Sequence, residues 1–305
     1  MRERDFIDVA DFSPDAVKKL IQDAFAIKAD PGSYTSALKG KALALIFEKP
    51  SLRTRVSFDV GIHQLGGFSL YLSPSDINLG KRESVADVAR NLERMVQGIM
   101  VRTFSHRIAV ELAEYAHIPV INGLTDFSHP CQAMADYMTV LEVKKRFEGL
   151  KLAYVGDGNN VVHSLIHAGI RLGVHVAIAT PPDYEPDAQV VRWAQENAPA
   201  TGAKLRLTHD PAEAVKDCDV VYTDVWTSMG QESEAAARLK VFQPYQVNGR
   251  LFSLARPDAI FMHCLPAHRG EEVTDEVIDS PRSVVFQQAE NRLHAQKAIM
   301  LDLMR

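Results

Sequence analysis

Short apolar segments rich in β-branched residues alternate with longer segments of helical periodicity along almost the whole sequence. The short segments predict buried strands, and the spacing of apolar residues between them predicts helices. In the first half, strands are expected at residues 42–47, 68–72, 98–102 and 118–121, with helices at 56–65, 85–95 and 110–116. In the second half, strands are expected at residues 152–155, 174–179, 204–207, 220–223, 260–263 and 284–286. Strands separated by helices predict the α/β class, in which parallel sheets are covered on both faces.

This number of strands is large for one sheet of that kind, so two domains are expected, each a mostly parallel sheet flanked by helices. The chain has 305 residues, which is enough for two domains that each bury a core. A charged segment at residues 142–151 follows a helix that starts near Pro130. We therefore expect one domain over residues 1–147, a second over residues 148–286, and a final helix within residues 287–305.

Composition and charge exclude several functional classes. The sequence has 34 Lys and Arg against 39 Asp and Glu, so it lacks the basic excess that is typical of nucleic-acid binders. No apolar run approaches the roughly 18 residues that a membrane helix needs. Cys131, Cys218 and Cys264 are far apart and odd in number, which predicts reduced thiols. We expect a cytoplasmic enzyme that binds neither nucleic acid nor a membrane.

Ligands of open α/β sheets bind beyond the carboxyl ends of the strands, so side chains there are candidate site residues. Residues 48–55 follow the first predicted strand, lead directly into a helix, and include Ser51, Arg53 and Thr54. A helix N-terminus offers unpaired N–H groups and partial positive charge, to which these side chains add hydroxyls and a guanidinium. The segment fits a phosphate site, and it fits equally well an N-capped helix with solvated arginines.

Two further features lie at the same edge of the first predicted sheet. Arg102 ends the third strand, and His129-Pro130-Cys131-Gln132 opens the helix after the fourth. Taken singly, Arg102 is typical of a surface ion pair and His129 of a helix cap. Together with residues 48–55, they indicate a pocket for a small dianion with a polar carbonyl. Arg102 and His129 would donate to oxygen, while Gln132 can both donate and accept.

The second half offers groups that suit an amino acid. Asp224 follows a predicted strand and precedes Ser228-Met229-Gly230, so its carboxylate can pair with an ammonium while the turn offers backbone groups. A turn aspartate with Met229 as packing is the simpler alternative. Asn160 can bind a carboxylate, or it can cap a helix that begins at Val161.

Other residues at these strand ends are less specific. His263-Cys264-Leu265-Pro266 ends a strand, and Arg292 lies in the last helix. His263, Cys264 and His268 match no strong zinc spacing, so no metal is expected. Gly156 and Gly158 resemble part of the dinucleotide fingerprint, but its third glycine is missing. A nicotinamide-dependent dehydrogenase stays open as the alternative from another class.

The candidate residues, in this order, resemble those of ornithine carbamoyltransferases in the aspartate/ornithine carbamoyltransferase superfamily. The resemblance covers essentially the whole chain and rests on Lys49-Pro50-Ser51-Leu52-Arg53-Thr54-Arg55, Arg102, His129-Pro130-Cys131-Gln132, Asp224 with Ser228-Met229-Gly230, and His263-Cys264-Leu265-Pro266. The Ser-Met-Gly element is absent from the related aspartate enzymes. Leu52 stands where the family commonly has threonine, and Asn78 and Arg82 stand where it commonly has glutamine and glycine.

The resemblance implies transfer of the carbamoyl group of carbamoyl phosphate to the side-chain amine of L-ornithine, by direct displacement and without a cofactor. The products are L-citrulline and phosphate, in arginine metabolism. Carbamoyl transfer to putrescine or acetylornithine is the alternative within this chemistry. The implied phosphate-binding residues are Ser51, Leu52, Arg53, Thr54 and Arg102. His129, with Thr54 and Arg102, polarises the carbamoyl oxygen, and Gln132 orients the carbamoyl nitrogen.

The resemblance also assigns roles to the second half. Cys264, Leu265 and Arg292 close over the carbamoyl group. Asn160, Asp224, Ser228 and Met229 bind ornithine, and we expect Asp224 and Cys264 to help the amine shed its proton. Residues 1–147 would then bind carbamoyl phosphate, residues 148–286 would bind ornithine, and the helix in residues 287–305 would pack on the first domain. The implied assembly is a homotrimer or a group of trimers.

Overall fold

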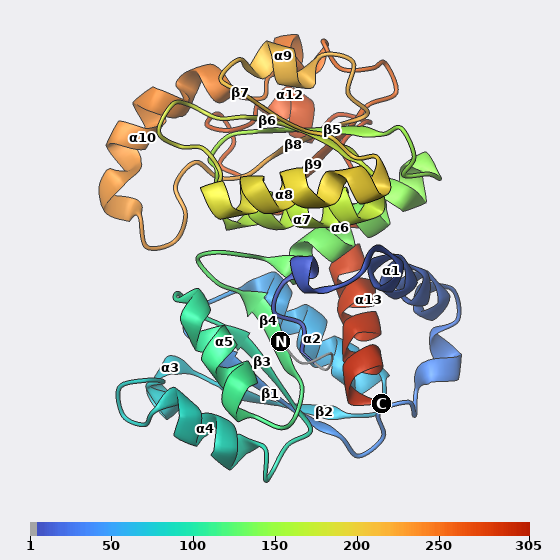
Figure 1. Ribbon diagram of the computed structural model, residues 1–305, viewed down its shortest axis with the longest axis vertical. Coiled ribbons are helices and arrows are strands. Elements are labelled where there is room, and N and C mark those ends of the chain that lie inside the picture. The colour runs from blue at the N-terminus through green and yellow to red at the C-terminus, as the bar shows by residue number, and fades with distance from the viewer. Residues whose placement is uncertain (1–4) are drawn as a thin grey trace. The chain divides into compact units, whose positions relative to one another are not determined.

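The structure of the chain, a computed structural model, describes residues 5–305. Two compact units make up the chain (Figure 1). The first unit comprises the chain up to Met138 together with Glu290–Arg305, and the second comprises Thr139–Ala289. Each unit contains its own parallel sheet with helices on both faces. The α/β class and the pair of parallel sheets predicted from the sequence are therefore confirmed.

The sheet of the first unit has the strand order β2-β1-β3-β4, and all its pairs are parallel. Its strands are β1 (Ala42–Phe47), β2 (Phe68–Leu72), β3 (Gly98–Arg102) and β4 (Val120–Leu124). The helical elements are η1 (Val9–Asp11), α1 (Pro14–Ala29), η2 (Pro31–Tyr34), α2 (Leu52–Gln64), α3 (Pro74–Ile77), α4 (Val85–Leu92), α5 (His106–Tyr115), and parts of α6 (Pro130–Lys144) and α13 (Val285–Met304). Phe47 lies opposite Arg102 in the register, so the loops after β1 and β3 begin side by side.

Both faces of this sheet are buried. Alternate residues of β1 point to opposite faces, and Ala42, Ala44 and Ile46 pack with apolar residues of α4 and α5. On the other face α2 and α13 pack closely, because a Cβ at Gly61 of α2 would lie 2.9 Å from Cε of Met300. The carboxyl edge of the strands is therefore the part of the sheet at which loops can present polar groups to a ligand.

The sheet of the second unit has the strand order β7-β6-β5-β8-β9, again with parallel pairs. Its strands are β5 (Lys151–Val155), β6 (His175–Ala179), β7 (Leu205–Thr208), β8 (Val220–Thr223) and β9 (Ile260–His263). The helical elements are α7 (Asn160–Leu172), α8 (Ala188–Thr201), α9 (Pro211–Val215), η3 (Glu232–Glu234), α10 (Ala235–Phe242), η4 (Gln243–Tyr245), α11 (Gly249–Phe252) and α12 (Asp275–Ile278).

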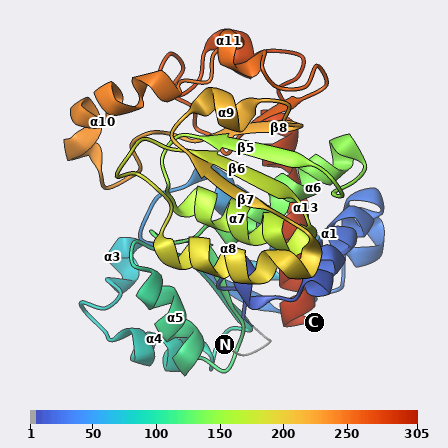
Figure 2. The same cartoon turned by 45° about the horizontal axis from the view of Figure 1, so that its top comes forward.

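Helices cover both faces of this second sheet as well. α7 and α8 lie on one face, and α9 and α12 lie on the other (Figure 1). Ala153, Val155 and Phe261 pack with apolar residues of α9, α11 and α12. α10 lies beside the sheet and not over its centre, as Figure 2 shows. This helix therefore stands among the loops that leave the strands.

Five strands lie at the predicted residues, namely β1, β2, β3, β8 and β9. The strand predicted at residues 284–286 is wrong, because Val285 begins α13. Only a single bridge joins Ser283 to Phe261 of β9, and of the two valines after it Val284 precedes the helix while Val285 is its first residue. Within residues 5–305, no helix combines the length and apolar character that crossing a membrane requires.

Candidate active site

Each sheet has one point at which the order of its strands reverses. In the first unit this point lies between β1 and β3, and in the second it lies between β5 and β8. The loops that follow the two adjacent strands lead in opposite directions at this point, which opens a crevice for a ligand. Residues 48–55 follow β1, and Arg102 is the last residue of β3. In the second unit, the loop from Gly156 follows β5 and the loop from Asp224 follows β8.

Ser51 is the N-cap of α2, since its Oγ accepts a hydrogen bond from the N–H of Thr54 at 3.2 Å. The capping role considered from the sequence is therefore present. A cap satisfies one of the first amides of a helix and leaves the end of the helix positive, so it does not compete with an anion site. The side chain of Leu52, the first helical residue, is 74% exposed.

Arg292 joins two of the predicted site residues within the first unit. One of its terminal nitrogens donates to Oε1 of Gln132 at 2.6 Å, and the other donates to Oγ1 of Thr54 at 3.2 Å. Gln132 in turn donates from Nε2 to Asp136 at 2.8 Å. Arg292, Gln132 and Thr54 are all buried. Three helices, α2, α6 and α13, thus hold one connected polar group.

His129 is buried at the start of α6, where its carbonyl accepts the N–H groups of Gln132 and Ala133. Burial, and then the positive charges of Arg292, Arg102 and Arg53, hold the pKa of His129 well below its ordinary value of 6.5. The imidazole is therefore neutral at neutral pH. Three guanidinium groups around a neutral hydrogen-bonding ring make an environment for a dianion with an uncharged polar part.

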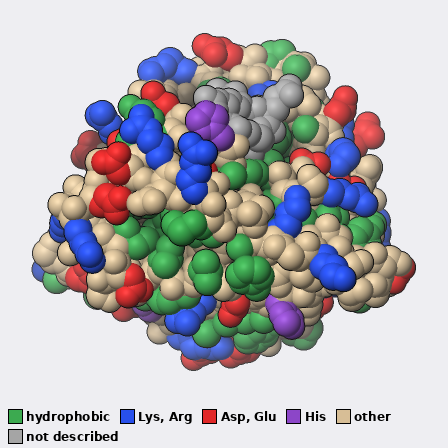
Figure 3. Space-filling view, turned by 90° about the horizontal axis from the view of Figure 1, so that it is seen from below, with side chains coloured by type: hydrophobic (Ala, Val, Ile, Leu, Met, Phe, Trp, Pro, Cys, Tyr) green, Lys and Arg blue, Asp and Glu red, His purple; other side chains and the backbone are tan. Residues whose placement is uncertain are grey.

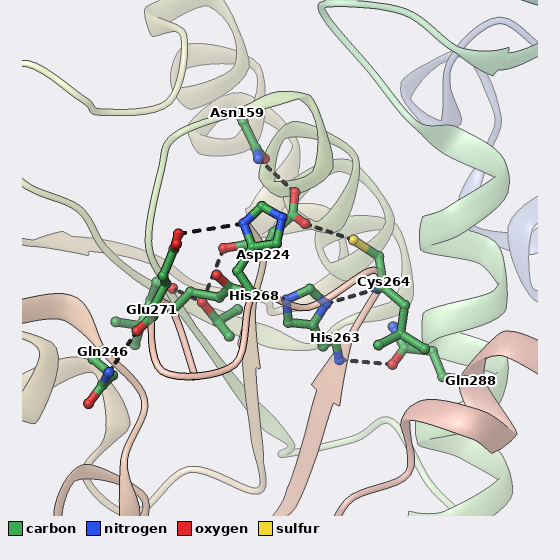
Figure 4. Close-up of polar contacts among 12 residues, drawn as sticks. Asn159, Asp224, Gln246, His263, Cys264, His268, Glu271 and Gln288 are labelled. Carbon is green, nitrogen blue, oxygen red and sulfur yellow. Dashed lines mark hydrogen bonds and ion pairs between the residues drawn. The ribbon is translucent and has the colours of Figure 1, made fainter. Parts of the chain in front are cut away.

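In the second unit, Asp224 is the centre of a compact polar group (Figure 4). Its Oδ1 accepts a hydrogen bond from the thiol of Cys264 at 2.9 Å, and its Oδ2 accepts one from Nδ2 of Asn159 at 2.8 Å. Asp224 is 5% exposed. Two of the residues predicted from the sequence are thus in direct contact, and a carboxylate so held suits an ammonium ligand.

The Cys264–Leu265 turn is held by a buried histidine. Nδ1 of His263 accepts the N–H of Leu265 at 2.8 Å, and its Nε2 lies 3.1 Å from Oε1 of Glu272. Because Nδ1 is an acceptor, Nε2 carries the proton and donates to the carboxylate. Leu265 itself has φ of 58°, a conformation that side chains disfavour, so this hydrogen bond helps to fix it.

The other predicted residues of the second unit lie in the same loops. α7 begins at Asn160, and the residue that caps it is Asn159, whose Oδ1 accepts the N–H groups of Val161 and Val162. The alternative in which Asn160 caps this helix is therefore wrong. Ser228 and Met229 follow Asp224 after β8, and the Met229 side chain is 44% exposed. Two adjacent asparagines are equally good capping residues by type, so the sequence does not separate Asn159 from Asn160 and only the structure identifies the cap.

Gly158 explains the partial dinucleotide fingerprint. A Cβ at this position would lie 2.4 Å from the carbonyl oxygen of Tyr184 and from the carbonyl carbon of Glu185. The N–H of Gly158 also donates to the Tyr184 carbonyl at 2.9 Å. The glycine is required by the chain's own backbone, in the space where a dinucleotide would need to approach, which disfavours the dehydrogenase alternative.

Within residues 5–305, two groups of side chains have ligand atoms close enough together to hold a metal ion. Ligand atoms of Asp224, His263 and Cys264 lie within 4.8 Å of one another, as do those of His268, Glu271 and Glu272. In the first group the Nδ1 lone pair of His263 already accepts the Leu265 N–H. In the second, Glu272 already holds His263. The protein thus uses donors in both groups for its own structure.

Two parallel sheets, each with buried polar side chains near its switch point, place the chain in the class of two-domain open α/β proteins, whose ligands bind at such switch points. Residues 4–142 match the family model "Aspartate/ornithine carbamoyltransferase, carbamoyl-P binding domain". Residues 148–303 match the model "Aspartate/ornithine carbamoyltransferase, Asp/Orn binding domain". The chain belongs to the aspartate/ornithine carbamoyltransferase family. The resemblance found in the sequence is thereby confirmed.

Individual relatives are similar over nearly the whole chain. The ornithine carbamoyltransferase of Thermococcus kodakarensis is 59% identical over 97% of this chain and 95% of its own length. The anabolic ornithine carbamoyltransferase of Pyrococcus furiosus is 56% identical over 97% and 95%. A solved structure of ornithine carbamoyltransferase from Pyrococcus furiosus has a TM-score of 0.96 at 55% identity, covering 99% of this chain and 97% of that one.

Proposed function

We propose that this chain transfers the carbamoyl group of carbamoyl phosphate to the side-chain amine of L-ornithine, giving L-citrulline and phosphate in arginine metabolism. Family membership and relatives more than half identical over nearly the full chain support this reaction. The observation that carries the proposal lies in the first unit, where Arg53, Arg102 and Arg292 place positive charge around a buried, neutral His129.

The first unit binds the phosphate of carbamoyl phosphate. The N-terminus of α2 contributes the Leu52 amide and the side chains of Ser51, Arg53 and Thr54, and β3 contributes Arg102. A helix N-terminus and guanidinium groups are the donors that a phosphate dianion binds most strongly in proteins. Leu52 in place of a hydroxyl residue does not remove this interaction, because the donor at that position is the backbone amide.

The carbamoyl group lies next to the phosphate and requires directional hydrogen bonds. His129, Thr54 and Arg102 donate to its oxygen, on which negative charge develops as the amine attacks. Gln132 orients its nitrogen, and Arg292, which holds both Gln132 and Thr54, fixes their geometry. The family resemblance also assigns Cys264 and Leu265 to this group.

The second unit binds ornithine. Asp224 pairs with an ammonium group of ornithine, Asn160 binds the carboxylate, and the loop with Ser228 and Met229 completes the site. The hydrogen bonds that Asp224 accepts from Cys264 and Asn159 support this role, because they hold the carboxylate in one orientation. Putrescine lacks the α-amino and carboxyl groups that such a site would recognise.

The reaction is a direct displacement without a covalent enzyme intermediate. The lone pair of the amine attacks the carbamoyl carbon, the bond from that carbon to the bridging oxygen breaks, and phosphate leaves with the electron pair. An alkyl amine has a pKa of roughly 10.4, so making it neutral at pH 7 costs about 4–5 kcal/mol. Asp224 and Cys264 orient the amine as it loses its proton, and the cations of the first unit neutralise the leaving phosphate.

The test is a product assay on the purified protein. Phosphate and the carbamoylated amine are measured with carbamoyl phosphate and each of three amines, namely L-ornithine (product citrulline), N-acetylornithine (N-acetylcitrulline) and putrescine (N-carbamoylputrescine). We expect equimolar citrulline and phosphate with ornithine, and kcat/KM values at least about 100-fold lower with the other two, because each leaves buried polar groups unpaired. If N-acetylornithine or putrescine had a higher kcat/KM than ornithine, that amine would be the substrate and the proposal of ornithine would be wrong.

The same proposal includes an organisation and a location. Residues 1–147 form the carbamoyl-phosphate domain, residues 148–286 form the ornithine domain, and the final helix, within residues 287–305, packs on the first domain. Contacts of α13 with α1, such as Lys28 to Asn291 at 2.8 Å, support the last point. The protein acts in the cytoplasm, which its reduced cysteines support.

We propose a homotrimer, or a group of trimers, as the assembly. Leu52, Val56 and Val60 follow one face of α2 and are 74%, 50% and 39% exposed, and the edge strand β2 exposes further apolar residues. Figure 3 shows apolar side chains gathered near the centre of one face, with lysine and arginine side chains around them. An apolar surface of this kind is typical of subunit contacts. Light scattering should give three chains or a multiple of three, and a monomer would contradict the assembly.

A further inference from the structure

Arg238 is a buried cation outside the proposed substrate-binding residues. It lies on α10, the helix beside the second sheet, and is only 4% exposed. Arginine side chains are rarely buried to this extent unless several partners hold them. The partners of Arg238 therefore indicate which parts of the second unit need to be held together.

Arg238 contacts both loops of the switch point in the second unit. One terminal nitrogen lies 2.5 Å from Oδ2 of Asp157, in the loop after β5. Its Nε donates to the carbonyl oxygen of Trp226 at 2.6 Å, in the loop after β8. Its other terminal nitrogen lies 3.5 Å from Glu234, one turn earlier. A planar guanidinium can make these contacts at once, whereas an ammonium cannot.

Aromatic rings enclose the same guanidinium. Its central carbon lies 4.9 Å from the ring centroid of Tyr184 and 5.1 Å from that of Phe242. Tyr184 and Phe242 pack edge to face, and Trp226 stacks on Phe242. The rings exclude water from the guanidinium, so its polar contacts are stronger than they would be on the surface.

The two loops that Arg238 joins carry every residue proposed to bind ornithine. Asp157 precedes Asn159 and Asn160, and Trp226 lies between Asp224 and Ser228. Asn159 donates to Asp224, so the two loops already share one direct hydrogen bond. Arg238 supplies a second connection between the two loops, because it contacts Asp157 in one and the backbone of Trp226 in the other.

We infer that Arg238 is a positioning residue for ornithine binding, which sets the distance between the Asp157–Asn160 loop and the Asp224–Met229 loop by binding both. The inference rests on the proposed function, since it concerns the ornithine half of that site. Arg238 is not one of the residues proposed to contact ornithine. Its effect passes through Asp157 and the backbone of Trp226.

Electrostatics support this role. Burial raises the pKa of Asp157 to about 6, the charge of Arg238 opposes that rise, and the charge of Asp224 adds to it. Asp157 and Asp224 are two carboxylates in neighbouring loops that repel each other when both are ionised. A cation bound to Asp157 offsets this repulsion, which lets Asp224 remain available to an ammonium.

The test compares kinetic constants of Arg238→Gln and Arg238→Lys with those of the wild type. We expect Arg238→Gln to raise KM for ornithine about tenfold or more, because a buried charge-assisted contact is lost, while KM for carbamoyl phosphate changes less than about twofold. Arg238→Lys, which keeps the charge but cannot bind both loops, should give an intermediate KM. The matched control is Arg250→Gln, an exposed arginine of the same unit.

A double-variant cycle separates positioning from loss of folding. If Arg238 acts through Asp157, then Asp157→Asn raises KM for ornithine, and the double variant is no worse than Arg238→Gln alone. Thermal unfolding of each variant is recorded alongside. Equal rises in both KM values, or unchanged KM for ornithine in a folded Arg238→Gln protein, would overturn the inference. A wild type that makes no citrulline would instead refute the proposed function, so the two failures are distinct.

Discussion

Burial decides the charge of His129, the histidine proposed to bind the carbamoyl oxygen. His129 is 5% exposed, and desolvation and then three guanidinium groups keep its pKa below the ordinary 6.5. A neutral imidazole can donate one hydrogen bond to a carbonyl oxygen. It does so without adding a fourth positive charge to those of the three guanidinium groups nearby. The same residue thereby links the site to the stability of the fold, because its protonation differs between the folded and unfolded chains.

The pH dependence of stability follows from this shift. The pKa of His129 is about 6.5 in the unfolded chain and lower in the folded one, so at pH values below about 6.5 the unfolded chain binds more protons. The free energy of unfolding should therefore fall as pH drops through that range. In His129→Gln this part of the decrease should be absent, as urea unfolding between about pH 5 and pH 8 would show. His63→Gln, exposed on α2, is the control, and identical slopes for wild type and His129→Gln would contradict the prediction.

Cys264 offers a second test at the residue level. Its thiol donates to Asp224 at 2.9 Å, so Cys264→Ala removes a donor from the carboxylate proposed to bind the amine. We expect kcat to fall about tenfold or more and its pH profile to shift, while Cys264→Ser, which keeps a donor, recovers most of the activity. Steady-state rates across pH with saturating carbamoyl phosphate measure both effects. A Cys264→Ala enzyme with unchanged rate and profile would make Cys264 a packing residue.

Some of these residues could be predicted from the sequence, and others could not. Arg102, His129 and Asp224 were predictable, because residues at the carboxyl ends of parallel strands share one edge of a sheet. Arg238 and Glu272 were not, because their partners, such as Asp157 and His263, lie elsewhere in the chain and no periodicity relates them. The sequence indicates which residues reach the edge of a sheet, whereas the buried ion pairs depend on how loops pack.

At the level of elements, the start of α7 is both a structural and a functional position. Asn159 caps the helix with Oδ1 and donates to Asp224 with Nδ2, so one amide joins the loop after β5 to the loop after β8. The helix predicted there could be recognised from its apolar spacing, but the choice of cap could not. The false strand at residues 284–286 has a similar origin, since a β-branched run at a helix start resembles a short strand.

The two functions of Asn159 can be separated by substitution. Asn159→Ala removes the cap and the donor to Asp224, and should destabilise the fold by about 1 kcal/mol and raise KM for ornithine. Asn159→Asp keeps a good capping side chain but places a second carboxylate against Asp224. Its stability should therefore stay closer to wild type than that of Asn159→Ala, while its KM for ornithine rises at least as much. Equal KM values for Asn159→Asp and wild type would remove Asn159 from the proposed site.

Gly158 gives a prediction about the packing of loops. An added Cβ would meet the backbone of Tyr184 and Glu185 at 2.4 Å, and backbone atoms cannot move aside as a flexible side chain can. Gly158→Ala should lower the free energy of unfolding by at least about 2 kcal/mol. Gly32→Ala is the control, because its nearest contact, Oδ1 of Asp30, would lie at an ordinary 3.5 Å. Denaturant unfolding of both variants measures the difference, and similar losses would show that the loop at Tyr184 can relax.

At the level of the whole molecule, the proposed function assigns the two substrates to different units. The cations that suit carbamoyl phosphate all lie in the first unit, and the carboxylate that suits ornithine lies in the second. Each unit has its own core and its own switch point, which is why the sequence could indicate two sites. The sequence could not indicate how binding of one substrate affects the other, because that depends on the charges present when both are bound.

Charge predicts the order in which the substrates bind. The proposed reaction brings the ornithine amine to the carbamoyl carbon, and therefore near Arg53, Arg102 and Arg292, which repel an ammonium until a dianion has neutralised them. Carbamoyl phosphate should bind the free enzyme, and it should raise the affinity for ornithine about tenfold or more, with the same factor in the reverse direction. Calorimetric titration of ornithine, alone and with the stable product phosphate as the dianion, measures this coupling, and chloride at equal ionic strength is the control. Equally tight ornithine binding in all three conditions would show that the two sites are independent and that substrate addition is random.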